Sequence, residues 1–266
     1  MEKLMIITVG TSIFHSACWD KNHQDFKKEL GDVWQEYCDN FANPGVSGYP
    51  GGLRDPEKRR REGKVLENFF KEHLNGITAD SWPEWVAPFE PPASPALRYS
   101  AEIATILRFA ENEAERCGTT WQAILEPYDF YFVHDSDTSS LSGIAGLHNR
   151  TYLERLLNTE PGRIKFVDIS GFSEHKKPQQ LIKALQEYRS FLKQAKNSVE
   201  PYYDTIDMVI TGGFKVYGVV GYGFLSNDKF RTLYMHDESS RVIIQSPNTM
   251  RIDNDREAPL PAIDNE

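Results

Sequence analysis

The chain has 266 residues, a formal net charge of −9 and 39% hydrophobic residues. This length suits one large domain, or one domain with an insertion, and it is enough to bury a hydrophobic core. No apolar run approaches the ~20 residues that a membrane-spanning helix needs, so the sequence excludes a spanning protein. The acidic charge argues against a basic surface for duplex nucleic acid. It still allows a small anionic ligand in a local pocket.

Cysteine and histidine spacing bears on metals, disulfides and cellular location. Cys18, Cys38 and Cys117 are widely spaced and form no CxxC pair, and the seven histidines include no ligand-spaced pair. We therefore expect no disulfide framework, structural metal or cofactor. Residues Met1–Ser12 contain a short apolar strand that is not followed by a small-residue cleavage site, so we predict no signal peptide and a cytoplasmic protein.

The chain opens with a continuous apolar run, Leu4–Val9, which ends in the small residues Gly10-Thr11-Ser12. This pattern predicts a buried strand followed by a tight turn. Residues 16–97 differ in character, because two charged helical patterns flank a loop rich in proline and glycine, and five prolines interrupt residues 82–95. We interpret residues 16–97 as a helical insertion on the main fold.

From Ser100 onward, predicted helices and strands alternate. The predicted helices are Ser100–Glu111 with Ser100 as N-cap, Ala145–Leu157, Lys177–Lys196 and Val216–Phe224. The predicted strands are Phe130–His134, Ile164–Ile169, Met208–Thr211, and a final hairpin of Arg231–His236 and Arg241–Gln245. The alternation predicts one α/β domain over residues 1–247 with a mainly parallel sheet, followed by a polar tail at 248–266.

Small polar residues follow three of the predicted strands, as Gly10-Thr11-Ser12, Ser136-Asp137-Thr138 and Gly212-Gly213-Phe214-Lys215. Ligands of parallel sheets bind beyond the carboxyl ends of the strands. Backbone N–H groups, hydroxyls and one lysine at that edge would suit a phosphate. Each turn alone is equally explained as an ordinary turn or helix cap, and neither GxGxxG after the first strand nor GxxxxGK[ST] occurs. The functional interpretation needs the three turns to meet at one edge.

Four motifs carry a resemblance to a known family. In chain order they are Met5–Ser12 (MIITVGTS), Leu97–Ile103 (LRYSAEI), Val133–Thr138 (VHDSDT) and Ile210–Lys215 (ITGGFK). Together with the hairpin at 232–245, they resemble the CRISPR-associated Rossmann-fold (CARF) proteins. The resemblance covers most of the chain apart from 16–97. It implies a Rossmann-like fold and a homodimer that binds a cyclic oligoadenylate across its two-fold axis.

Proteins of this family either carry a fused effector domain or stand alone. Arg231 and His236 have the R-x4-H spacing of the ribonuclease effectors, but in a strand, side chains five residues apart point to opposite faces. Glu62-Gly-Lys64 has the E-x-K spacing of metal nucleases, but it lies in a charged helical run. We interpret both matches as coincidental. The chain then resembles the standalone branch, the ring nucleases.

The resemblance implies metal-independent cleavage of cyclic tetra-adenylate, which would switch off type III CRISPR signalling in antiviral defence. A ribose 2′-OH attacks the adjacent phosphate in line and leaves a 2′,3′-cyclic phosphate, a reaction that needs conformation and charge stabilisation. By motif match the catalytic residues are Ser12, positioning the 2′-OH or the phosphate, and Lys215, stabilising the developing charge. The implied ligand-binding residues are Gly10, Thr11, His15, Ser136, Asp137, Thr138, Gly212, Gly213 and Phe214. His15 is also a candidate general acid or base, although a lone loop histidine is more often structural.

Two alternatives remain at this stage. One is a non-catalytic cyclic oligoadenylate sensor that regulates a separate effector, and the other is a nucleotide-binding protein with an unrelated ligand. The sequence leaves open whether the ring has four or six adenylates. It also leaves open whether residues 16–97 form a lid, a dimer arm or a docking surface.

Overall fold

The computed structural model describes residues 2–10, 100–135, 145–146, 149–150, 153–154, 157, 162–171, 178–211, 215–224, 228–236, 241–253, 255 and 258–259. For residues 215, 216, 236, 258 and 259 the description covers the backbone. The insertion predicted at 16–97 lies outside the described residues.

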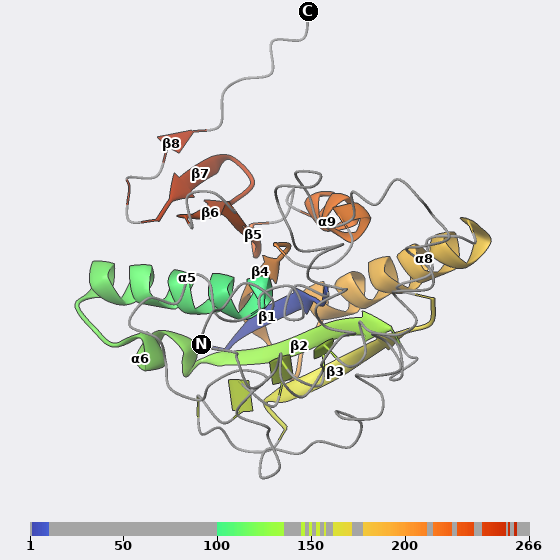
Figure 1. Cartoon of the computed structure of the whole chain (residues 1–266), viewed down its shortest axis with the longest axis horizontal. Coiled ribbons are helices and arrows are strands. Elements are labelled where there is room, and N and C mark those ends of the chain that lie inside the picture. Colours follow the sequence, from blue (N-terminus) through green and yellow to red (C-terminus); the bar gives the residue numbers. More distant parts are fainter. Residues whose placement is uncertain are drawn as a thin grey trace, which may run out of the picture.

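Within the described residues, eight strands form one sheet in the order β3-β2-β1-β4-β5-β6-β7-β8 (Figure 1). The strands are β1 (Glu2–Thr8), β2 (Tyr128–Asp135), β3 (Ile164–Ile169), β4 (Tyr203–Val209), β5 (Phe230–His236), β6 (Arg241–Gln245), β7 (Thr249–Ile252) and β8 (Ala258–Pro259). The pairs from β3 to β5 are parallel, and those from β5 to β8 are antiparallel. The parallel part has the order 3-2-1-4-5 of a doubly wound sheet. The predicted α/β fold and the antiparallel pairing of β5 with β6 are confirmed.

The described helices are α5 (Ala101–Cys117), α6 (Trp121–Leu125), α8 (Pro178–Lys196) and α9 (Lys215–Tyr222), and the described residues between 145 and 157 are also helical. The Ser100 side chain accepts the backbone N–H of Ile103 at 3.1 Å, which confirms the predicted N-cap of α5. Gly118 ends α5 in the left-handed conformation, with φ of 65°. Local capping signals therefore set both ends of this helix.

Helices cover both faces of the sheet. On one face, Tyr188 of α8 and Tyr217 of α9 meet edge to face at 5.3 Å, over a buried cluster that includes Ile6 and Met208. On the other face, Phe109 of α5 meets Tyr128 of β2 edge to face at 6.4 Å. Figure 1 shows α8 and α9 next to each other, with α5 at the opposite side of the view. The central strand β1 lies between these layers, and its residues from Leu4 to Thr8 are all buried because both faces are covered.

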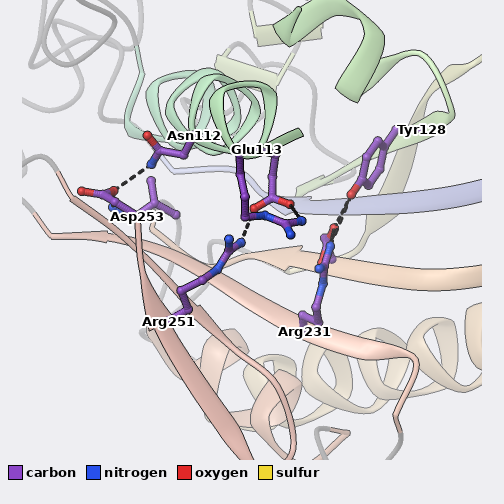
Figure 2. Close-up of polar contacts among 9 residues, drawn as sticks. Asn112, Glu113, Tyr128, Arg231, Arg251 and Asp253 are labelled. Carbon is purple, nitrogen blue, oxygen red and sulfur yellow. Dashed lines mark hydrogen bonds and ion pairs between the residues drawn. The ribbon is translucent and has the colours of Figure 1, made fainter. Parts of the chain in front are cut away.

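The last two strands correct the expectation of a tail from residue 248. Residues 249–252 form β7 against β6, and residues 258–259 form β8 against β7. Asp253 explains why β7 stays in place, because its Oδ1 accepts the side-chain N–H of Asn112 and the backbone N–H of Val242, each at 2.8 Å (Figure 2). A four-residue strand carries too little periodicity to be recognised, and its partners on α5 are about 140 residues away in sequence.

Strand β4 begins five residues earlier than predicted and ends at Val209. The residues before Met208 include Asp204, Thr205 and Asp207, which break the apolar pattern. Asp207 is nevertheless fully buried, because Arg231 of the neighbouring strand pairs with it. The short helix α6 was also missed, since its five residues give no helical period.

Candidate functional site

The carboxyl ends of β2, β1 and β4 lie at one edge of the sheet. These three strands are neighbours and parallel, with Thr8 opposite Val133 and Ile7 opposite Val209. Two further contacts tie the strand ends together. The Val9 N–H donates to the Val133 carbonyl at 2.9 Å, and the Thr8 hydroxyl donates to the Val209 carbonyl at 3.2 Å. Three segments separated by more than 70 residues in sequence therefore end side by side.

Most of the residues predicted to form the site lie outside the described residues. They are Thr11, Ser12, His15, Ser136, Asp137, Thr138, Gly212, Gly213 and Phe214. Lys215 is described as the first residue of α9, with no account of its side chain. Gly10 is described fully. The structure thus brings together the strands that precede the three turns, and the convergence of the Ser12 and Lys215 side chains stays a prediction.

Gly10 is held by a residue that sequence reasoning did not single out. Its backbone N–H donates to Oε1 of Glu102 at 2.5 Å, and Glu102 is completely buried in the first turn of α5. A carboxylate at this place is favoured by the positive end of the helix dipole. The resemblance assigned the Gly10 N–H to a ligand phosphate, whereas in this structure the donor is bonded within the protein. Glu102 belongs to the SAEI motif, so the sequence marked this residue, but nothing in the sequence indicated that Gly10 is its partner.

The end of β4 is held from the same helix. The hydroxyls of Thr105 and Thr211 are 2.7 Å apart, and Thr211 Oγ1 also accepts the backbone N–H of Met235 on β5 at 2.8 Å. The Thr105 hydroxyl lies 2.7 Å from the Ala101 carbonyl as well. Thr105 is fully buried. These contacts connect α5 to the segment that leads into α9.

His134 is a buried titratable group near the same edge that sequence reasoning also missed. Its Nδ1 is 2.7 Å from the Asp135 carbonyl oxygen, and its Nε2 is 3.1 Å from Asp168 Oδ1 without the alignment of a hydrogen bond. The ring meets Phe166 edge to face at 4.6 Å. Burial lowers the pKa of His134, against the opposing effects of the Asp135 carbonyl and the Asp168 carboxylate. The neutral imidazole is therefore favoured at pH 7.

The buried network on the α5 face is a structural framework (Figure 2). Tyr128 donates to Asp207 Oδ2 at 2.6 Å, and Arg231 forms two hydrogen bonds to the same carboxylate. Burial lowers the pKa of Arg231, but the Asp207 carboxylate outweighs this and raises it overall. Arg231 therefore has a structural partner in Asp207, whereas the side chain of His236, the other residue of the R-x4-H spacing, lies outside the description.

A groove of about 580 Å³ lies between α8 and α9. Its lining residues are Arg189, Lys193, Lys196, Asn197, Val219, Val220, Gly223 and Phe224. None of these residues belongs to the predicted site. The groove is therefore separate in composition from the edge at which β1, β2 and β4 end.

Among the described residues, no three or more His, Cys, Asp or Glu side chains are grouped so that they could hold a metal ion. None of the described helices has the length and apolar character that crossing a membrane requires. Neither a protein-family model nor a curated protein matches the chain. Functional assignment therefore depends on the sequence motifs and on the geometry of the sheet edge.

Proposed function

We propose that this protein is a CARF-type ring nuclease that binds cyclic tetra-adenylate as a homodimer and cleaves it without a metal ion. One observation carries the proposal. The three strands that precede the GTS, SDT and GGFK turns are adjacent and parallel, so their carboxyl ends share one edge. Open α/β sheets bind ligands at this kind of edge. The sequence motifs and the strand order of the sheet therefore support the same ligand site, at the edge where β1, β2 and β4 end.

The proposed chemistry uses a nucleophile that the substrate itself contains. The O2′ atom of one ribose forms a bond to the adjacent phosphorus while the bond from phosphorus to the O5′ leaving group breaks. The 2′-OH loses its proton, and the 5′ oxygen gains one. The product carries a 2′,3′-cyclic phosphate, and two such cuts convert the ring into two linear di-adenylates.

Lys215 and Ser12 have separate roles in this proposal. The ammonium of Lys215 would offset the negative charge that grows on the non-bridging oxygens in the transition state. The hydroxyl of Ser12 would hold the 2′-OH or the phosphate in line for attack. Both roles depend on position. Water takes the proton of the 2′-OH and supplies one to the 5′ oxygen, so neither Ser12 nor Lys215 acts as a base.

A homodimer suits a ring ligand because both can share a two-fold axis. Dimers with two-fold symmetry have self-complementary interfaces, so the two protomers present the same residues on either side of the axis. One Ser12 and one Lys215 from each protomer would then face opposite phosphates of a ring of four adenylates. Cleavage of the ring would remove the second messenger and end type III CRISPR signalling.

The test is incubation of the purified protein with cyclic tetra-adenylate in EDTA, with products separated by chromatography. We expect linear di-adenylate from the wild type and very little from Lys215→Ala or Ser12→Ala. Lys193→Ala is the matched control, because it removes an exposed lysine of α8 that is not part of the proposed site. Tight binding of an intact ring would support the non-catalytic sensor instead. Absence of binding to rings of four or six adenylates would refute both functions.

A further inference from the structure

We propose that Glu102 and Thr105 are positioning residues, through which the first turns of α5 hold Gly10 and Thr211 at a fixed separation. Gly10 begins the turn after β1 (the β1 turn), and Thr211 begins the turn after β4 (the β4 turn). This inference rests on the proposed function for its catalytic consequence. Its structural consequence can be tested without any ligand. Neither residue is one of the two proposed catalytic residues, Ser12 and Lys215.

The contact to the β1 turn is short and buried. Glu102 Oε1 accepts the Gly10 N–H at 2.5 Å, and the Glu102 side chain has no exposed surface. A buried carboxylate that accepts a backbone N–H makes a charge-assisted hydrogen bond, which is stronger than a neutral one. Gly10 precedes Ser12 by two residues. Glu102 therefore constrains the backbone immediately before the proposed Ser12 site.

The contact to the β4 turn comes from the same side of the helix. The Thr105 and Thr211 hydroxyls are 2.7 Å apart, and Met235 of β5 donates its N–H to Thr211 at 2.8 Å. Thr211 precedes Lys215 by four residues. Thr105 therefore constrains the chain that leads to the proposed Lys215 site.

Glu102 and Thr105 lie on one helix face, so a single rigid element contacts both turns. Residues three apart on a helix are neighbours on one face, with a rise of about 4.5 Å between them. The helix is capped by Ser100 directly before this turn, so its first turn is well ordered. A rigid element that contacts both turns fixes their separation more firmly than the sheet edge alone. Small misplacements matter, because about 1 Å at a reacting pair can cost about 100-fold in rate.

The first experiment measures amide hydrogen exchange in the free protein, over residues 9–16 and 210–216. We expect Glu102→Leu to speed exchange in the first segment and Thr105→Val in the second, by about fivefold, which corresponds to loss of one hydrogen bond. Glu102→Gln keeps an acceptor oxygen and should restore most of the protection. Asn112→Ala is the control, because it removes a side-chain hydrogen bond of α5 at a distance from both turns.

Two results of the exchange experiment would overturn the inference. One is unchanged exchange in both segments of Thr105→Val. The other is an equal increase in Asn112→Ala, which would show a general loss of stability and no local positioning. Thr105→Val removes one hydroxyl at constant shape, so it keeps the test decisive if Glu102→Leu does not fold.

The second experiment measures cleavage of cyclic tetra-adenylate by the same variants. We expect kcat of Thr105→Val to fall about 10- to 100-fold with a much smaller change in ligand Kd, because a misplaced pair still binds the ring. Glu102→Gln should recover much of the rate that Glu102→Leu loses. An unchanged kcat in Thr105→Val would contradict the positioning role. If the wild type does not cleave the ring, the proposed function fails, and the exchange experiment still decides whether α5 holds the two turns.

Discussion

Arg231 of β5 and Asp207 of β4 form a bidentate ion pair across two neighbouring strands, with Nε–Oδ1 and Nη2–Oδ2 distances of 2.7 Å each. The Asp207 carboxylate is completely buried, and the Tyr128 hydroxyl donates to it as well. A buried charge is tolerated only when it is paired and hydrogen-bonded. The pair therefore allows an acidic residue in the middle of a parallel strand.

Substitution of Arg231 by methionine should destabilise the protein by about 3–5 kcal/mol, because it leaves the buried Asp207 carboxylate without its partner. Urea unfolding measures this loss. Lys183→Met is the control, since Lys183 and Glu187 form an exposed pair at 3.7 Å and its removal should change stability by at most about 0.5 kcal/mol. An Arg231→Met variant as stable as the wild type would contradict the structural role of this pair.

Substitution of Asp253 by alanine should release β7 from the sheet. Asp253 Oδ1 accepts two hydrogen bonds, from Asn112 and Val242, and each unsatisfied donor costs about 1–3 kcal/mol. We expect a lower unfolding free energy and faster amide exchange over residues 249–252. Asp255→Ala is the matched control, because Asp255 is exposed and lies 4.0 Å from Arg241. Slow exchange in Asp253→Ala would mean that β7 is held by something else.

The stability of the protein should decrease below about pH 6.5, partly through His134. Burial lowers the pKa of His134 in the folded state, so between that pKa and the ordinary value of about 6.5 the unfolded chain binds more protons. The unfolding free energy then rises with pH in this interval. The contribution of His134 is fully present above about pH 6.5 and is lost below the folded-state pKa. Urea titrations from pH 5 to 8 measure it. His134→Gln should have a flatter profile, and an identical profile would show that His134 makes no such contribution.

Substitution of Ser100 by alanine should cost about 1 kcal/mol and loosen the first turn of α5, because the Ser100 hydroxyl accepts the Ile103 N–H. Since this turn contains Glu102, amide exchange over residues 9–16 should also become faster. Thr120→Ala removes the corresponding cap of α6, where Thr120 accepts the Ala123 N–H at 3.3 Å. A similar loss of stability without effect on residues 9–16 is expected for that control. Equal effects of the two variants on those residues would contradict a local role of the α5 cap.

The sequence by itself determined the elements with strong local signals. Leu4–Val9 is apolar apart from Thr8 because a central parallel strand is covered on both faces, and β1 was recognised for that reason. Ser100 marks the start of α5 because an N-cap acts on residues within one turn. The alternation of strands and helices was also enough to predict a parallel α/β sheet, and β3 was predicted with its observed bounds.

Tertiary structure decided the features that depend on partners distant in sequence. Asp207 is acceptable inside β4 only because Arg231 lies opposite it, and β7 is held by residues of α5. The Gly10 N–H is directed to Glu102, which is 92 residues away, although the pattern around Gly10 suggested a ligand donor. Local patterns report propensity and burial, whereas the pairing of polar groups is set by which elements the fold brings into contact.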